Sequence, residues 1–298
     1  MTIFIFGEAM LEYHSHGGAD GLRYGGDTLN TAIHLARMGL DVAYVTAVGT
    51  DPVSDALVAA WADEGVDTRF VLRHPSRSPG IYAIHVDTQG ERSFLYWRVK
   101  SAAREMFALP EMAPVLADAE GASLLYFSLI SLAILPDQGQ SALLDLAAAV
   151  RHNGGKVAYD SNFRRNLWST LDEARNVSNL AMAACDIGLP TNVDEQQLYG
   201  ASLSESQIAM RWHHEGCAEV VVKAGEIGCL YFGGATDARI IPANIVTVVD
   251  SSGAGDAFNA GYLAHRNNDG DIEAAIQSGQ RLAAWVIQRN GAIPRQDS

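Results

Sequence analysis

The sequence lacks the features that mark membrane and secreted proteins. Its longest apolar stretch, Leu124 to Leu135, is interrupted by Ser128 and Ser131 and is too short to span a bilayer. The N-terminus begins with a strand-like run, Ile3 to Phe6, and has neither a basic region nor a cleavage site, which argues against a signal peptide. We therefore expect a cytoplasmic protein that does not enter a membrane.

Cysteine is scarce. The three cysteines, Cys185, Cys217 and Cys229, are widely separated and fit neither a disulfide framework nor a zinc ribbon. This usage suits a reducing cytoplasm, and we expect the three thiols to be buried fillers of the core.

Positive charge is also in short supply. The chain has 21 Lys and Arg against 35 Asp and Glu, for a net charge of −14. Such an excess of negative charge argues against binding a nucleic-acid backbone or an anionic membrane. An anionic small ligand would need local positive charge, which directs attention to individual Arg and Lys residues.

Several common motifs are absent. No Gly-x-x-x-x-Gly-Lys-Ser/Thr phosphate loop occurs, and no Gly-x-Gly-x-x-Gly follows the first strand, so P-loop and dinucleotide-binding interpretations are disfavoured. We find no internal repeat, low-complexity tract or linker, and therefore expect one domain over residues 1–298.

Strand-like and helix-like runs alternate along most of the chain, which predicts an α/β fold with a mostly parallel sheet covered on both faces. The expected strands are Ile3–Phe6, Val42–Val48, Leu124–Phe127, Val157–Asp160, Ile187–Leu189, Val220–Val222 and Cys229–Phe232. The expected helices are Thr28–Met38, Ser54–Glu64, Gln138–His152, Leu171–Ala184, Glu205–Glu215, Ala257–Asn267 and Ile272–Arg289.

Two regions, residues 10–25 and 70–98, break this alternation with apolar and polar residues in turn and no helix between them. Asp87 to Gly90 has the composition of a hairpin turn. We expect a small antiparallel sheet inserted into the α/β body. Such a sheet can act as a lid over a cleft or pair with another subunit.

A glycine-rich turn follows the strand-like run Ile245 to Val249 and precedes a helix-like one. Gly253 and Gly255 allow a tight turn and close approach of a ligand, and the helix start that follows favours an anion. Asp256 stands at that start. Backbone amides for a phosphate beside a carboxylate that accepts a hydroxyl proton are what phosphoryl transfer to an alcohol needs. The plainer alternative is a strand-to-helix turn with Asp256 as a favourable helix-start charge.

A second glycine turn, Gly25-Gly26, also enters a helix. Asp27 is explained by an N-cap role alone. Asn30, one turn into the helix, is better explained by a polar ligand above it. Gly26 and Asn30 are therefore candidate binding residues.

Two further segments place polar residues on or beside predicted strands. Tyr96 and Arg98 share one face of the last lid strand, and a hydroxyl beside a guanidinium suits a hydroxylated carboxylate, although a surface arginine on an edge strand is the alternative. Asp160, Asn162 and Arg164 leave the carboxyl end of another strand, where α/β folds place ligand contacts.

The segment Leu189 to Glu195 leaves a strand and enters a helix. Asn192 and Glu195 are three residues apart, and the acidic residue either caps the helix or holds the water shell of Mg²⁺. A buried strand followed by the glycine turn after Lys223 is a further place for a nucleotide to touch backbone.

Taken together, the two glycine turns resemble the two sequence signatures of the ribokinase-like (PfkB) sugar kinases, in the same order and over essentially the whole chain. Within that family the chain looks most like kinases of 2-keto-3-deoxygluconate, on the segments Gly25–Thr31, Gly90–Arg98, Ile130–Leu135 and Asn153–Trp168. It departs from the family in having Ser251-Ser252 where Thr-Thr is usual, and Glu8 and Glu12 where many members place an Asp after the first strand.

The resemblance implies a three-layer α/β/α ribokinase-like fold and ATP-dependent phosphorylation of the terminal primary hydroxyl of a keto-deoxy sugar acid, giving 2-keto-3-deoxy-6-phosphogluconate. It implies Asp256 as the base and Gly253, Ala254 and Gly255 as the anion hole. The implied sugar-acid contacts are Gly26, Asn30, Tyr82, Tyr96, Arg98 and Arg164, together with Asp256. The implied nucleotide-side contacts are Asn162, Asn192, Lys223, Gly225, Gly228, Gly253 and Gly255. Glu195 would stand near Mg²⁺, through water, and a monovalent cation is left open.

Two rivals remain. One is a kinase of the same fold for a neutral ketose, such as a fructokinase; Arg98 and Arg164 argue against it, because two cations beside a neutral sugar have no partner. The other is a sugar-acid sensor without turnover, against which the complete Asp256 turn argues. We also expect a homodimer or larger homo-oligomer formed through the apolar lid face of Ile81, Ala83, Leu95 and Trp97.

Overall fold

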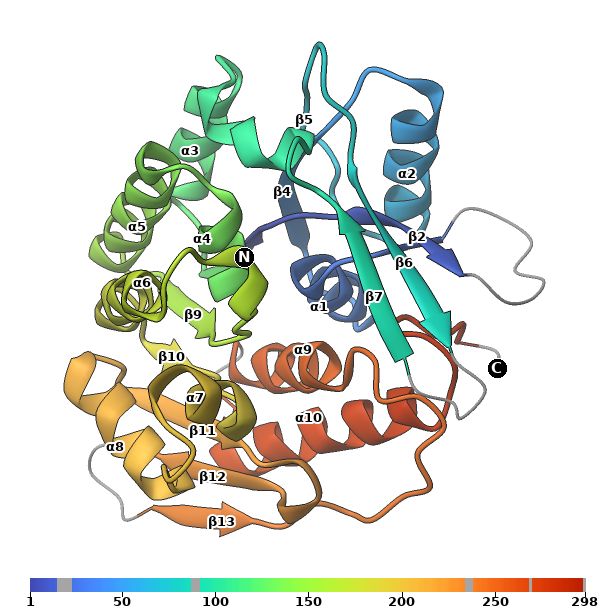
Figure 1. Cartoon of the computed structure of the whole chain (residues 1–298). Helices are drawn as coiled ribbons and strands as arrows, with labels where there is room; N and C mark the ends of the chain where they lie inside the picture. The colour runs from blue at the N-terminus through green and yellow to red at the C-terminus, as the bar shows by residue number, and fades with distance from the viewer. Residues whose placement is uncertain (15–22, 87–91, 234–237, 268–269, 297–298) are drawn as a thin grey trace.

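The computed structural model describes residues 1–14, 23–86, 92–233, 238–267 and 270–296 (Figure 1). Its centre is a nine-stranded sheet in the order β13-β12-β11-β10-β9-β8-β1-β4-β5. Pairing is parallel from β11 to β5, whereas β12 and β13 add as antiparallel strands. The strands are β1 (Ile3–Phe6), β4 (Val42–Val48), β5 (Val71–Arg73), β8 (Leu124–Ser128), β9 (Lys156–Asp160), β10 (Ile187–Gly188), β11 (Glu219–Lys223), β12 (Cys229–Phe232) and β13 (Arg239–Ile241).

Helices cover both faces of this sheet. The α-helices are α1 (Asp27–Arg37), α2 (Pro52–Asp63), α3 (Met112–Ala119), α4 (Leu129–Ile134), α5 (Asp137–His152), α6 (Leu171–Ala183), α7 (Asn192–Tyr199), α8 (Glu205–Glu215), α9 (Ala254–Arg266) and α10 (Ile272–Ile287), and short 3₁₀ helices are η1 (Ala102–Ala108), η2 (Arg165–Leu167) and η3 (Gly225–Ile227).

Alternation along the strands produces the three layers. Ile3 and Ile5 of β1 belong to a buried cluster with residues of α1, α2, α9 and α10. Phe4 and Phe6 point the other way, into a cluster with residues of α3 to α6 and α8. The predicted three-layer α/β/α fold with a mostly parallel sheet is confirmed.

The second sheet has the order β3-β2-β6-β7, from β2 (Met10–His14), β3 (Arg23–Gly25), β6 (Gly80–Val86) and β7 (Arg92–Trp97). The prediction of an antiparallel sheet is wrong for one pair, because β2 and β6 run parallel. Val71 to Arg73, predicted within the lid, instead forms the edge strand β5 of the central sheet. The expected turn at Asp87–Gly90 lies outside the described residues, but β6 and β7 form the antiparallel hairpin that it implies.

The strand expected at Ile245 to Val249 is also wrong. Residues 242–250 form no helix or strand, and Ile245 is 92% exposed. An apolar β-branched run predicts a strand only where a neighbouring strand offers a ladder, and the sheet ends at β13. In the described residues, we find no helix with the length and apolarity needed to cross a bilayer.

Candidate active site

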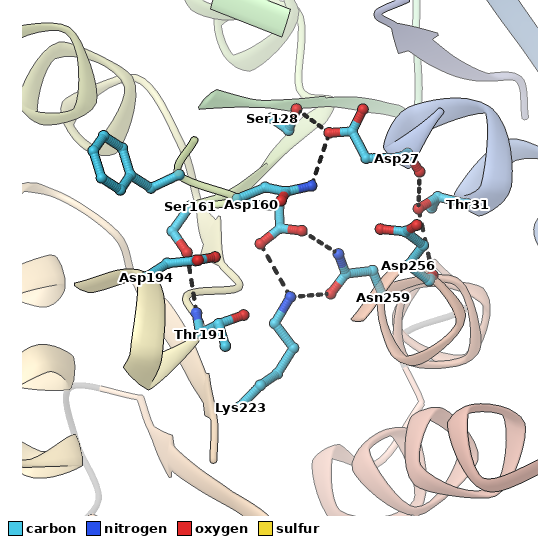
Figure 2. Close-up of polar contacts among 12 residues, drawn as sticks. Asp27, Thr31, Ser128, Asp160, Ser161, Thr191, Asp194, Lys223, Asp256 and Asn259 are labelled. Carbon is cyan, nitrogen blue, oxygen red and sulfur yellow. Dashed lines mark hydrogen bonds and ion pairs between the residues drawn. The ribbon is translucent and has the colours of Figure 1, made fainter. Parts of the chain in front are cut away.

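The two glycine turns meet in space although 226 residues separate them. Asn30, in the first turn of α1, donates from Nδ2 to Oδ2 of Asp256 at 2.7 Å. Thr31 donates from Oγ1 to the backbone oxygen of Asp256 at 3.3 Å (Figure 2). The predicted binding helix and the predicted base are therefore parts of one site.

The start of α9 has no side-chain cap, and of its first amides the N–H of Ala254 makes a long 3.4 Å bond to the Ser251 backbone oxygen. Gly253 is the N-cap, with a φ of 72°, and no side chain caps the helix. A Cβ on Gly253 would lie 2.5 Å from the Cβ of Ala292, so glycine is required on both conformational and steric grounds. The first N–H groups of an uncapped helix lack intrahelical partners, and this geometry suits an anion.

Asp256 lies in the first turn of α9 and is buried. Burial, and next the negative charge of Asp27, raise the pKa of the Asp256 carboxyl to about 8, while the hydrogen bond from Asn30 opposes the shift. A carboxylate whose pKa is near neutrality is a far better proton acceptor than an ordinary surface aspartate.

Asp27 does more than begin a helix. The N-cap of α1 is Gly26, and Asp27 is the first helical residue. Its Oδ2 accepts hydrogen bonds from the Ser128 hydroxyl at the end of β8 and from Nδ2 of Asn162 beyond β9, the latter at 3.0 Å (Figure 2). Burial raises the pKa of the Asp27 carboxyl. The N-cap explanation is thus replaced by a role in joining three segments at the carboxyl edge of the sheet.

Lys223 is a buried cation at the carboxyl edge of the sheet. Its Nζ donates to Oδ1 of Asp160 and to Oδ1 of Asn259, both at 3.0 Å (Figure 2). Asn259 in turn donates from Nδ2 to Oδ2 of Asp160 at 2.8 Å and to the Tyr126 hydroxyl at 3.0 Å. A Cβ on Gly255 would lie 3.7 Å from the Lys223 ammonium, so this charge lies close to the first turn of α9.

Arg98 does not present a free charge. It is buried, and its Nε donates to Oε2 of Glu8 at 2.7 Å while Nη2 donates to the same oxygen. Glu8 is buried as well. Arg164 also has a carboxylate partner, because its Nη1 lies 3.6 Å from Oδ1 of Asp194.

These pairs correct the argument for an acidic substrate. We expected that two cations beside a neutral sugar would have no partner, whereas each arginine has a partner within the chain. Charge alone therefore does not separate a sugar acid from a neutral sugar.

The two lid tyrosines face each other across the β6–β7 pair, with Tyr82 opposite Tyr96. The Tyr82 hydroxyl of β6 donates to the carboxylate of Glu12 on the adjacent lid strand β2. Glu12 therefore has a partner within the lid and is not free to bind a sugar. Tyr96 is 48% exposed.

The two α7 residues expected near Mg²⁺ both have partners. Asn192 donates from Nδ2 to Glu205 at 3.0 Å. Glu195 is fully buried and accepts a hydrogen bond from Nη2 of Arg211 at 2.6 Å. A fully buried carboxylate does not touch the waters of a hydrated ion, so this arrangement does not support the expected role of Glu195. No group of three His, Cys, Asp or Glu suited to a metal is present in the described parts of the chain.

The glycine turn after Lys223 has the shape expected of a backbone contact. Gly225, the first residue of η3, has a φ of 57°, and Gly228, its C-cap, has a φ of 108°. A Cβ on Gly228 would lie 2.2 Å from the backbone oxygen of Ile241, so the turn packs tightly on the loop after β13.

Sequence reasoning missed four contributors: Ser128, Asn259, Asp194 and the network role of Asp27. Asn259 carried a usable signal, since it lies three residues after Asp256 on the same helix face and is a polar residue in an otherwise apolar run. Ser128 offered none, because a serine that ends a strand is common in turns.

Comparison with known proteins agrees with this geometry. A model of the pfkB family of carbohydrate kinases matches residues 7–298. The chain is 38% identical over 298 residues to a 2-dehydro-3-deoxygluconokinase of Haemophilus influenzae, covering 98% of this chain and 95% of that protein. It is 41% identical over 303 residues to a 2-dehydro-3-deoxygluconokinase of Escherichia coli K12, covering 99% and 97%. A solved structure assigned as a ribokinase II of E. coli, in complex with ATP and Mg²⁺, superposes with a TM-score of 0.84 at 23% identity and covers 98% of this chain and 94% of that one. The chain therefore belongs to the pfkB family of carbohydrate kinases.

Proposed function

We propose that the protein phosphorylates the terminal primary hydroxyl of 2-keto-3-deoxygluconate with ATP, giving 2-keto-3-deoxy-6-phosphogluconate. The observation that carries the chemistry is Asp256, a buried carboxylate of raised pKa at the uncapped start of α9 and hydrogen-bonded to Asn30. The choice of substrate is supported by the names of relatives at about 40% identity over nearly the whole chain.

In the proposed reaction, Asp256 accepts the proton as the sugar hydroxyl attacks the γ-phosphorus. The amides of Gly253, Ala254 and Gly255 stabilise the charge that develops on the transferring phosphoryl group. The Lys223 ammonium, held by Asp160 and Asn259 close to Gly255, adds to that stabilisation. Holding the sugar hydroxyl, Asp256 and the anion hole in one place supplies the rest of the rate enhancement, because the reacting groups no longer have to meet by diffusion.

Mg²⁺ fits this site only as an ion held mainly by waters and phosphates, since Mg²⁺ keeps several waters and takes few carboxylates. Of the two α7 carboxylates, Asp194 is better placed to contact the waters of Mg²⁺, because its side chain is 15% exposed whereas that of Glu195 is fully buried. Burial raises the pKa of Asp194 to about 6 and the Arg164 charge opposes the shift. When bound, Mg²⁺ would neutralise phosphate charge.

For the nucleotide we propose the edge formed by Lys223, Gly225 and Gly228. The side chains of Ile227, at the end of η3 before β12, and of Ile245, on the loop after β13, are both exposed and apolar. Exposed apolar surface of this kind suits an adenine ring. The same proposal accounts for an apolar run at 245–249 that forms no strand.

The activity is tested with an ADP-release assay over a panel of sugars and sugar acids. The proposal expects 2-keto-3-deoxygluconate to be the best substrate. A preference for fructose would establish the neutral-sugar kinase, and tight binding of the acid without ADP release would establish the sensor.

A pH profile tests the base. Because Asp256 acts in its ionised form and its pKa is raised to about 8, kcat/KM should rise as pH increases toward about 8 and then level off. Asn30→Ala should move the inflection to higher pH, since it removes the hydrogen bond that favours the carboxylate. A flat profile between pH 6 and pH 9, with chemistry limiting, would contradict the base assignment.

The same shift has a stability consequence with a definite sign. The folded pKa lies above the ordinary value of 3.8, so protonated Asp256 favours folding, and this contribution is lost as pH rises through about 8. Asp256→Asn should flatten that part of the stability profile.

We propose in addition that the lid sheets of two subunits pack on each other. Leu95 and Trp97 of β7 are 58% and 60% exposed, and Ile81 on β6 and Tyr13 on β2 are exposed as well. The register places Ile81 opposite Trp97, so these residues share one face. Leaving an apolar face of this kind exposed to solvent is unfavourable for a small sheet. A two-fold contact between identical subunits is the commonest way to cover it.

Replacing Leu95 and Trp97 by Ser should therefore shift the protein to monomer in light scattering and raise the KM for the sugar, because the lid would lose its support. The matched control is Ile240→Ser, an equally exposed apolar residue on the edge strand β13. A monomeric wild-type protein at micromolar concentration would contradict the proposal.

A further inference from the structure

Two of the three cysteines lie side by side. The Sγ atoms of Cys185 and Cys217 are 2.7 Å apart, and both residues are fully buried. This separation is shorter than the ~3.5–4.0 Å of ordinary nonbonded contact between heavy atoms. The expectation that the three cysteines are buried is confirmed, and all three are free thiols, but the closeness of Cys185 and Cys217 was not expected.

The backbone explains why these two residues meet. Strands β10 and β11 are parallel neighbours, with Ile187 opposite Glu219. Cys185 and Cys217 each stand two residues before those partners, and the ladder extends toward them, because Glu219 N donates to Asp186 O at 3.0 Å. The register thus sets the cysteines opposite each other.

This position suits a covalent bridge. Neighbouring strands lie about 4.7–4.9 Å apart, within the ~4.4–6.8 Å between Cα atoms that disulfides span. The two sulfur atoms need to approach by only about 0.7 Å from their present separation to reach bonding distance.

We propose that Cys185 and Cys217 are a disulfide-forming site. Oxidation by hydrogen peroxide proceeds when one thiolate attacks the O–O bond, giving a sulfenic acid and hydroxide. The second thiol then attacks that sulfur and expels water. In total two thiols lose two protons and two electrons, one S–S bond forms, and peroxide is reduced to two waters. A small disulfide such as oxidised glutathione gives the same product and two molecules of its thiol.

Burial sets the rate of this reaction. It raises the pKa of the Cys185 thiol, and only the thiolate reacts, so the folded protein should oxidise slowly. Local opening at the ends of α6 and α8, which immediately precede the two cysteines, exposes the pair and speeds the reaction.

The bridge lies away from the catalytic residues. Both cysteines precede the N-terminal ends of their strands, whereas Asp160 and Lys223 stand at the C-terminal ends of β9 and β11. The bridge would close a loop of the chain that contains α7 and α8, with the Glu195–Arg211 pair. Oxidation should therefore stabilise this part of the fold against unfolding while leaving catalysis unchanged.

The test is to equilibrate the purified protein in glutathione buffers of increasing oxidising strength, with and without urea below the unfolding transition. Thiols are then counted after denaturation, and peptides are mapped without reduction. We expect the count to fall from three to one, a Cys185–Cys217 linked peptide, and a higher urea midpoint that dithiothreitol reverses.

Cys229→Ala is the matched control, because it removes a buried cysteine and keeps the pair. It should retain the linked peptide, whereas Cys185→Ala and Cys217→Ala should each lose both the peptide and the shift in midpoint. The wild-type peptide map decides the question even if those two variants fold poorly. Two results would overturn the proposal: three free thiols in the most oxidising glutathione buffer with urea, or a disulfide that includes Cys229.

Discussion

Asp256→Asn should reduce kcat by roughly 10²–10⁴, the usual contribution of a positioned general base. The amide of Asn has nearly the shape of the carboxylate but no basic oxygen of comparable strength. Asp256 is buried at the start of α9 with its Oδ2 bonded to Asn30, so the substitution changes the acceptor of the proton and little else.

Stability distinguishes this loss from misfolding. The raised pKa of Asp256 means that its ionised form is unfavourable in the fold, chiefly through burial and then through repulsion from Asp27. A neutral side chain removes both costs, and the variant should melt at the wild-type temperature or above it at pH 8.

Asp271→Asn is the matched control. It makes the same chemical change at another helix start, the N-cap of α10, where asparagine caps as well as aspartate. It should leave kcat unchanged. Turnover of Asp256→Asn within a few-fold of wild type, in an assay limited by chemistry, would remove Asp256 from the base role.

The repeating part of the fold was predictable because it follows from local pattern. The strands Ile3–Phe6, Val42–Val48 and Cys229–Phe232 and the helix Glu205–Glu215 have the predicted bounds. Buried strands and one-sided helices leave a period in the sequence that needs no knowledge of their partners.

The ion pairs and strand pairings that could not be predicted from the sequence depend on residues far apart in the chain. The Arg98–Glu8 pair spans 90 residues and the Lys223–Asp160 pair 63, and no local pattern reports either. For the same reason Arg98 was interpreted as an available cation. The parallel β2–β6 pairing was missed because alternation gives the face of a strand but not its direction.

The candidate site was predictable to the extent that glycines mark backbone requirements. Gly26, Gly225, Gly228 and Gly253 all adopt positive φ in the structure. A conformation that only glycine adopts easily leaves a trace in the sequence, whereas an ion pair between two distant residues leaves none.

Arg98→Ala should lower the free energy of unfolding by about 3–5 kcal/mol, because it leaves the Glu8 carboxylate buried without its partner. This loss of stability does not depend on substrate, and it is separate from any effect of the substitution on binding of the sugar acid. Arg69→Ala is the control, since that arginine pairs with Asp67 at the surface and its loss should barely move the denaturant midpoint.

A double variant separates the two roles of Arg98. Glu8→Ala with Arg98→Ala removes both charges, so most of the lost stability should return. The Nη1 group of Arg98 makes no hydrogen bond to any residue that the structure describes, so under the proposed function it is the donor expected to bind the carboxylate of the sugar acid. If that donor binds the acid, the KM for 2-keto-3-deoxygluconate should stay raised in the double variant while the KM for ATP is unchanged. Recovery of the sugar-acid KM together with stability would show that Arg98 only holds Glu8, and that the substrate carboxylate is bound elsewhere.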